Sequence, residues 1–240
     1  MKAFILAAGL GERLRPLTDD RPKALVSVAG MTMLERTIRT LADAGVTSFV
    51  VNVHYFGGQI IDFLASNGNF GLDIQISDER DLLRDTGGAI KHAAPLLEGS
   101  GKFLIHNVDI VSNLDYRWFI DQAENSDADA TLLVSDRSTS RYLLFDDAGL
   151  LKGWTNVKTG EVKSPYPGFK AESYSRKAFS GIHVFSDRLL AETASMTDKF
   201  SVIDFYLKEC LNHKIEAVEY PSLKLLDLGT PAAVAAYNNL

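Results

Sequence analysis

Cysteine is almost absent from this sequence of 240 residues, in which Cys210 is the only one. A lone cysteine excludes an intramolecular disulfide and is typical of proteins that work in a reducing compartment. Long hydrophobic runs are also missing. The N-terminal segment, MKAFILAAGLGERL, has an apolar run that is too short to cross a membrane and leads directly into charged residues. We therefore expect a cytoplasmic protein without a membrane anchor.

Positive charge is not in excess either, because the formal net charge is −6 at pH 7. Nucleic-acid-binding proteins usually present a basic surface, so a nucleic-acid partner is disfavoured. Hydrophobic residues make up 46% and charged residues 23%, which is the balance of an ordinary globular protein. Such a chain is long enough to bury a sizeable core, and we expect a monomer or a small homo-oligomer.

Strand-like and helix-like segments alternate along the chain. Expected strands are 2–7, 48–53, 72–76, 102–106, 130–134, 179–185 and 224–228, and expected helices include 33–44, 57–66, 88–97, 115–125, 203–212 and a last one opened by Pro231. This alternation predicts an α/β fold, a Rossmann-like three-layer sandwich around a mostly parallel mixed sheet. Ligands of such sheets bind at the carboxyl ends of the strands, which directs attention to the loops after Ala7, His106 and Leu226.

The loop after the first strand combines glycines with cations. Gly9 and Gly11 allow backbone N–H groups to approach a phosphate closely, and Arg13 and Lys23 can offset its charge. A dinucleotide-binding loop would need a third glycine where Leu14 stands and would enter a helix at once, and no P-loop motif is present. The loop therefore indicates phosphate binding of another kind.

The sequence of this loop resembles a motif of the sugar-phosphate nucleotidyltransferase family. The segments AAGLGERLRPLT at 7–18 and RPKAL at 21–25 are similar to the family pattern A-A-G-x-G-T-R-L-x-P-L-T followed by P-K-P-L, with Glu12 and Ala24 as departures. By this resemblance Ala8 and Gly9 lie against the base and ribose, Gly11, Glu12 and Arg13 surround the triphosphate, and Lys23 contacts its phosphates. TGGA at 86–89 is similar to the family's G-T-A-G-A turn, which implies nucleotide contacts by Gly87 and Gly88.

Two carboxylates follow apolar segments and are candidate metal ligands. Asp109 comes after the strand 102–106 in the wording N-V-D, where the family has N-G-D, and Asp227 lies in LDLGTP, which resembles the family's V-D-V-G-T-P. Carboxylates at strand ends can hold Mg²⁺ against phosphate oxygens. We expect both to follow strands of the one parallel sheet and to share a magnesium ion, although an aspartate before such a turn is often only a helix cap.

The acceptor side carries fewer recognisable residues. The resemblance implies acceptor contacts by Asn107 and by Gly181, which lies in the segment SGIH. The E-K-P motif, whose lysine clamps the sugar phosphate in many members, is absent, and Lys152 and Lys158 are weak substitutes. The acceptor region therefore looks more similar to short bacterial N-acetylmuramic acid 1-phosphate uridylyltransferases and to short mannose- and heptose-1-phosphate guanylyltransferases.

We therefore expect a magnesium-dependent enzyme that transfers a nucleoside monophosphate from an NTP, UTP first and GTP next, to a sugar 1-phosphate. Arg13, Lys23 and Asp109 are the expected catalytic residues in one domain spanning 1–240, with an NTP-binding part at about 1–110 and an acceptor-binding part at about 111–240. An ionised acceptor phosphate needs no general base, which agrees with the absence of a nucleophile–base motif. The alternatives are a cytidylyltransferase for an alcohol phosphate such as phosphocholine and a non-catalytic nucleotide or nucleotide-sugar sensor.

Overall fold

A ten-stranded mixed sheet runs through the protein, whose structure is a computed structural model that describes residues 1–239. Eight strands follow the order β11-β10-β9-β12-β6-β1-β4-β5, while β8 branches from β12 and β13 pairs with β8. The parallel part consists of β1 (Lys2–Leu6), β4 (Ser48–Val53), β5 (Asp73–Asp78) and β6 (Lys102–Asn107). Antiparallel partners continue it on the other side, where β12 (Ser175–Ser186) pairs with β6. The expected α/β fold with a mixed sheet is confirmed.

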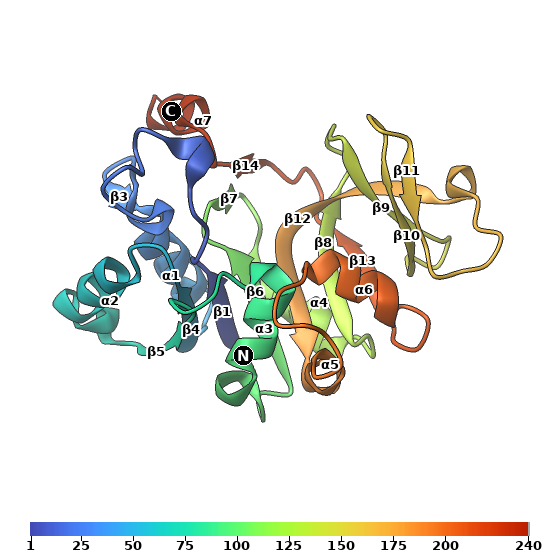
Figure 1. The fold of residues 1–240 in the computed structure, drawn as a ribbon, viewed down its shortest axis with the longest axis horizontal. Helices are drawn as coiled ribbons and strands as arrows, with labels where there is room; N and C mark the ends of the chain where they lie inside the picture. The colour runs from blue at the N-terminus through green and yellow to red at the C-terminus, as the bar shows by residue number, and fades with distance from the viewer. Residues whose placement is uncertain (240) are drawn as a thin grey trace.

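Side chains of β1 alternate between two separate hydrophobic cores, as expected for a strand buried on both faces. Ala3 and Ile5 belong to one core, and Phe4 and Leu6 belong to the other. The first core contains α1 (Met33–Asp43), α2 (Gly57–Ser66), α4 (Tyr116–Asn125) and α7 (Pro231–Asn238). The second contains α3 (Asp85–Leu97), α5 (Asp187–Thr193) and α6 (Val202–Glu209), which cover the near face of the sheet in Figure 1. Helices therefore cover both faces, as a three-layer sandwich requires.

Local signals set several of the helix starts. Thr32 caps α1 by accepting a hydrogen bond from the Glu35 N–H at 3.1 Å, and Thr230 caps α7 in the same way, with Pro231 as its first residue. Glu35 itself pairs with Arg39 rather than reaching back to Thr32, so only one half of the expected capping box forms.

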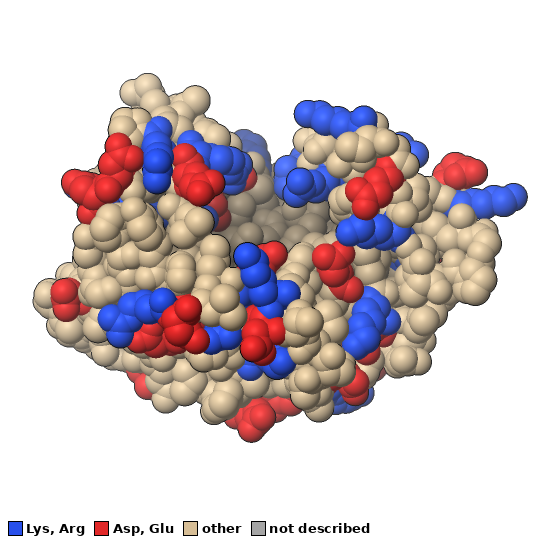
Figure 2. Space-filling view, viewed as in Figure 1, with Lys and Arg blue, Asp and Glu red and all other residues tan. Residues whose placement is uncertain are grey.

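The second half of the chain builds a smaller sheet region to the right of Figure 1. It comprises β8 (Ala130–Ser135), β9 (Arg141–Phe145), β10 (Leu151–Asn156), β11 (Glu161–Lys163) and β13 (Ile215–Glu219). The amino-terminal end of β12 pairs with β9 and its remainder pairs with β6 and β8, so this one strand joins the two regions. A hollow separates the lobe that carries β9–β11 from the lobe that carries α7 and β3 (Figure 2), and Lys and Arg side chains lie on both of its rims.

Two short two-stranded sheets were not expected from the sequence. β2 (Ser27–Val28) pairs with β3 (Met31–Thr32), and β7 (Ile110–Ser112) pairs with β14 (Leu225–Asp227), in both cases outside the main sheet. The placement of the segment 224–228 in the parallel sheet is therefore wrong. Its strand, β14, is only three residues long and pairs antiparallel with β7. It is mostly exposed, whereas a strand of the main sheet would be buried. None of the helices formed by residues 1–239 is long and apolar enough to cross a membrane.

Candidate nucleotide and acceptor pockets

Asn52, at the end of β4, fixes the start of the glycine loop. Its side-chain oxygen accepts hydrogen bonds from the N–H groups of Ala7 at 2.6 Å and Ala8 at 3.2 Å. Its amide nitrogen donates to Glu79 at 2.9 Å. Glu79 is almost fully buried, and burial raises the pKa of its carboxyl group. The backbone that leaves β1 is thus held in place by a buried polar pair on the neighbouring strands.

Gly11 turns the loop through a conformation that favours glycine. Its φ is +69°, and an added Cβ would lie 2.9 Å from the Thr18 methyl carbon. The Thr18 hydroxyl donates to the Gly11 carbonyl at 2.8 Å and closes the loop. Short 3₁₀ turns then carry the polar residues, one at Glu12–Leu14 and one at Lys23–Leu25. This local path brings Arg13 and Lys23 to the same end of the sheet as Gly9.

Lys23 and Asp109 form an ion pair although 86 positions separate them in sequence. The Lys23 Nζ donates to the Asp109 Oδ2 at 2.8 Å, and the two side chains are only 17% and 9% exposed. Asp109 lies in the turn between β6 and β7, so its carboxylate stands at the carboxyl end of β6. A pair this little exposed is screened weakly by solvent, which makes it a specific feature of the site rather than a solvated surface contact.

The pairing of β7 with β14 brings Asp227 next to Asp109. Asp227 lies opposite Ile110 in the ladder, and the Leu228 N–H donates to the Asp109 carbonyl at 2.8 Å. Arg13 Nη2 lies 3.6 Å from Asp227 Oδ2, where both side chains are well exposed. An added Cβ at Gly229 would lie 2.6 Å from both Arg13 and Asp227, so glycine is needed for this approach. The predicted metal ligands are therefore neighbours, each beside one cation of the glycine loop.

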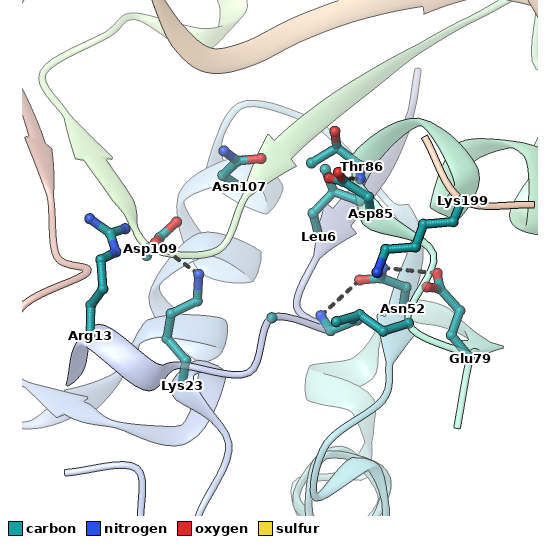
Figure 3. Close-up of a pocket in the computed structure, with 13 residues that line it drawn as sticks. Leu6, Arg13, Lys23, Asn52, Glu79, Asp85, Thr86, Asn107, Asp109 and Lys199 are labelled. Atoms are coloured by element: carbon teal, nitrogen blue, oxygen red, sulfur yellow. Dashed lines mark hydrogen bonds and ion pairs between the residues drawn. The ribbon is translucent and has the colours of Figure 1, made fainter. Parts of the chain in front are cut away.

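These residues surround a cavity of about 480 Å³, which we call the first pocket (Figure 3). The sequence-predicted residues among its lining are Ala8, Gly9, Arg13, Lys23, Asn107 and Asp109. Gly11 and Glu12 lie just beside it, in a shallower hollow that they share with Arg13, Lys23 and Gly229. Lining residues that the sequence did not single out are Asn52, Glu79, Asp85, Thr86 and Lys199. The first part of the chain thus supplies most of this pocket, and Lys199 reaches it from the second part.

Gly87 and Gly88 are not among the residues that line the first pocket. Both of their N–H groups donate to the Phe200 carbonyl, at 2.9 and 3.1 Å. An added Cβ would meet the Phe200 ring at Gly87 and the Asp198 carbonyl oxygen at Gly88, each at 2.4 Å. The close backbone approach that two adjacent glycines permit is therefore made by the chain itself, and Asp85 and Thr86, just before them, face the pocket.

A second cavity of about 570 Å³, the second pocket, adjoins the first. The two pockets share Leu6, Asp85, Thr86 and Asn107 as lining residues. Gly181 does not line it, but it has a φ of +79°, and an added Cβ there would lie 2.6 Å from the Asn107 amide nitrogen. Gly181 therefore leaves room for Asn107 at the junction of the two pockets.

Neither weak substitute for the missing lysine motif lines the first or the second pocket. Lys152 pairs with Asp146 at 3.3 Å, and Lys158 lies in the turn between β10 and β11. Arg141 and Lys163 line the second pocket instead, together with Trp154. The only sequence signal that could have pointed to these residues is the alternation of side chains between the two faces of the strands β9–β11.

Two histidines and Cys210 are buried. His183 and His106 hydrogen-bond to Tyr206 and Tyr116, and burial lowers the pKa of His183 to about 3 and that of His106 to about 4. Burial likewise raises the pKa of the Cys210 thiol to about 11. These three side chains are buried packing residues.

The fold and the two adjoining pockets define an α/β protein of the nucleotide-diphospho-sugar transferase type. A family model described as nucleotidyl transferase matches residues 2–143, and the chain belongs to that family. It is 49% identical over 111 residues to the N-acetylmuramate alpha-1-phosphate uridylyltransferase of Caulobacter vibrioides, covering 45% of this chain and 46% of that protein. The enzyme of the same name from Neisseria meningitidis serogroup B is 43% identical over 116 residues, covering 48% and 50%.

The chain thus spans about half the length of the curated relatives that it matches. Among solved structures, HddC from Yersinia pseudotuberculosis aligns over 99% of this chain and 98% of its own, with a TM-score of 0.77 and 25% identity. The resemblance to the sugar-phosphate nucleotidyltransferases, seen first in the glycine loop, is confirmed.

Proposed function

We propose that this protein is a nucleotidyltransferase that moves a nucleoside monophosphate from an NTP to a sugar 1-phosphate and releases pyrophosphate. One observation carries the proposal: two carboxylates from distant parts of the chain meet two cations of the glycine loop at the mouth of a pocket. A second pocket adjoins it through Asn107 and Asp85. Two adjoining cavities suit a reaction between two substrates, and we assign the NTP to the first pocket and the acceptor to the second.

Magnesium is the proposed cofactor, and the residues present fit it. Asp109 and Asp227 offer only oxygen donors, which suit a hard divalent cation. Each carboxylate also lies beside a cation of the protein, so positive charge already compensates its negative charge. When bound there, magnesium would offset charge on the phosphate oxygens of the NTP. Lys23, which now pairs with Asp109, would then be free to contact the triphosphate.

The proposed reaction is an in-line attack by the acceptor's phosphate oxygen on the α-phosphate of the NTP. The new P–O bond joins acceptor and nucleotide, and the bond to the β-phosphate breaks, so pyrophosphate leaves with the electron pair. Such a step depends on positioning and charge compensation. Arg13 and Lys23 would stabilise the departing pyrophosphate, Ala8 and Gly9 would lie along the nucleoside, and Asn107 would face the acceptor.

The proposed nucleotide donor is UTP, with GTP as the second choice. The proposed compartment is the cytoplasm, where NTPs are available. Pyrophosphate release should be measured with the four NTPs against N-acetylmuramic acid 1-phosphate, N-acetylglucosamine 1-phosphate, mannose 1-phosphate and phosphocholine, with and without Mg²⁺. We expect release only with the metal, and fastest with UTP and a sugar 1-phosphate. A preference for CTP with phosphocholine would replace the proposal by the alcohol-phosphate alternative, and tight NTP binding without turnover would favour the sensor.

A further inference from the structure

One face of the small β9–β10–β11 sheet forms a wall of the second pocket. The strand register aligns its residues in two neighbouring rows, namely Arg141, Asn156 and Glu161 in one and Leu143, Trp154 and Lys163 in the other. Residues two positions apart on a strand face the same side of a sheet, so the two rows share one face. Five of these six residues line the second pocket. This wall therefore contains an aromatic ring, an amide, a carboxylate and two cations.

The two cations of this wall differ in their charge balance. Lys163 Nζ lies 3.1 Å from Asp204 and 3.9 Å from Glu161, and it lies over the Trp154 ring at 5.3 Å from its centroid. The Arg141 guanidinium has neither an ion-pair nor a hydrogen-bond partner within residues 1–239. Arg141 is thus the one cation of the second pocket without a carboxylate of the protein beside it.

Arg141 lies away from the group of charges that we assign to the triphosphate. The first pocket is lined by Arg13, Lys23 and Asp109 but not by Arg141, and none of those three lines the second pocket. In Figure 1, β9 lies on the right of the molecule, away from β7 and β14 near its centre. An acceptor whose phosphate reaches Asn107 at the junction would therefore extend its far side toward the wall that carries Arg141.

From this arrangement we infer that the acceptor bears a carboxylate in addition to its 1-phosphate, and that Arg141 binds this carboxylate. The inference rests on the proposed function of the two pockets. A guanidinium presents parallel N–H donors that match a carboxylate in a bidentate pair. One uncompensated cation matches one added negative charge, and Trp154 beside it offers an apolar face for the sugar ring. Arg141 is thus a specificity-determining residue for an acidic sugar 1-phosphate.

The test compares acceptors that differ at the proposed carboxylate. We expect kcat/KM to be about 10- to 100-fold higher for N-acetylmuramic acid 1-phosphate than for its lactyl amide, because the amide loses a charge-assisted hydrogen-bond pair. Arg141→Gln should lower kcat/KM for the acid by a similar factor and leave the amide almost unchanged. Arg141→Lys should give an intermediate loss for the acid, because it keeps the charge but not the planar fork. Lys158→Gln removes a cation outside the pocket and should change neither acceptor.

Equilibrium binding keeps the inference testable if no acceptor turns over. Free N-acetylmuramic acid should bind the wild-type protein more tightly than its amide, and this preference should vanish in Arg141→Gln. An equal loss for acid and amide in Arg141→Gln would place the 1-phosphate at Arg141 and overturn the inference, as would a wild type that does not prefer the acid. Absence of turnover with every NTP and acceptor, with the binding preference intact, would instead count against the proposed reaction alone.

Discussion

Gly88 lies in the first turn of α3, and its replacement by alanine should destabilise the fold. An added Cβ would lie 2.4 Å from the carbonyl oxygen of Asp198. That oxygen belongs to the backbone, so it cannot rotate away as a flexible side chain can. Either α3 or the segment 198–200 must move, and the hydrogen bonds from Gly87 and Gly88 to the Phe200 carbonyl must lengthen.

The size of the effect follows from two opposing terms. Overpacking a tight interior site costs about 1–3 kcal/mol. Replacing glycine by alanine inside a helix gains about 0.5–1 kcal/mol. The midpoints of the two ranges leave a net loss of about 1 kcal/mol, which lowers the melting temperature of a chain of this size by roughly 2–4 °C.

Thermal unfolding followed by circular dichroism measures this shift, and Gly58→Ala is the matched control. Gly58 lies in α2, and an added Cβ meets no atom within 4 Å, so only the helix term remains. We expect Gly58→Ala to raise the melting temperature by roughly 1–4 °C. If Gly88→Ala were as stabilising as Gly58→Ala, the segment 198–200 would not be seated on α3, and the position of Lys199 in the first pocket would be wrong as well.

Three further outcomes are expected. Asp109→Asn and Asp227→Asn should each remove most turnover, and the double variant should lose little more, because both act on one metal; additive losses measured as kcat would contradict this. Lys23→Ala should raise the KM for NTP several-fold at least, and an unchanged rate at subsaturating NTP would exclude Lys23 from the site. His183 has a pKa below that of the unfolded chain, so its stabilising effect is complete above about pH 6.5 and declines below it, by about 2 kcal/mol at pH 5. Urea unfolding of His183→Gln should show a shallower acid-side decline than the wild type does.

Features that depend on neighbours along the chain could be predicted from the amino-acid sequence alone. Apolar segments of strand length predicted β1, β4 and β6, and the cap residues Thr32 and Thr230 marked the starts of α1 and α7. The glycine loop could be predicted in the same way, because Gly11 and Arg13 follow β1 closely in the chain.

Contacts between residues that are distant in the sequence depend on the packing of the folded chain. The backbone positions of Asp109 and Asp227 become neighbours through the pairing of β7 with β14, and both strands are too short for a reliable hydrophobic pattern. Likewise, a pair of adjacent glycines predicts a close approach but not the partner, which is the segment 198–200. Arg141 reaches the second pocket through the register of β9 with β10, and register is set by packing across the sheet rather than by the residues beside Arg141 in the chain.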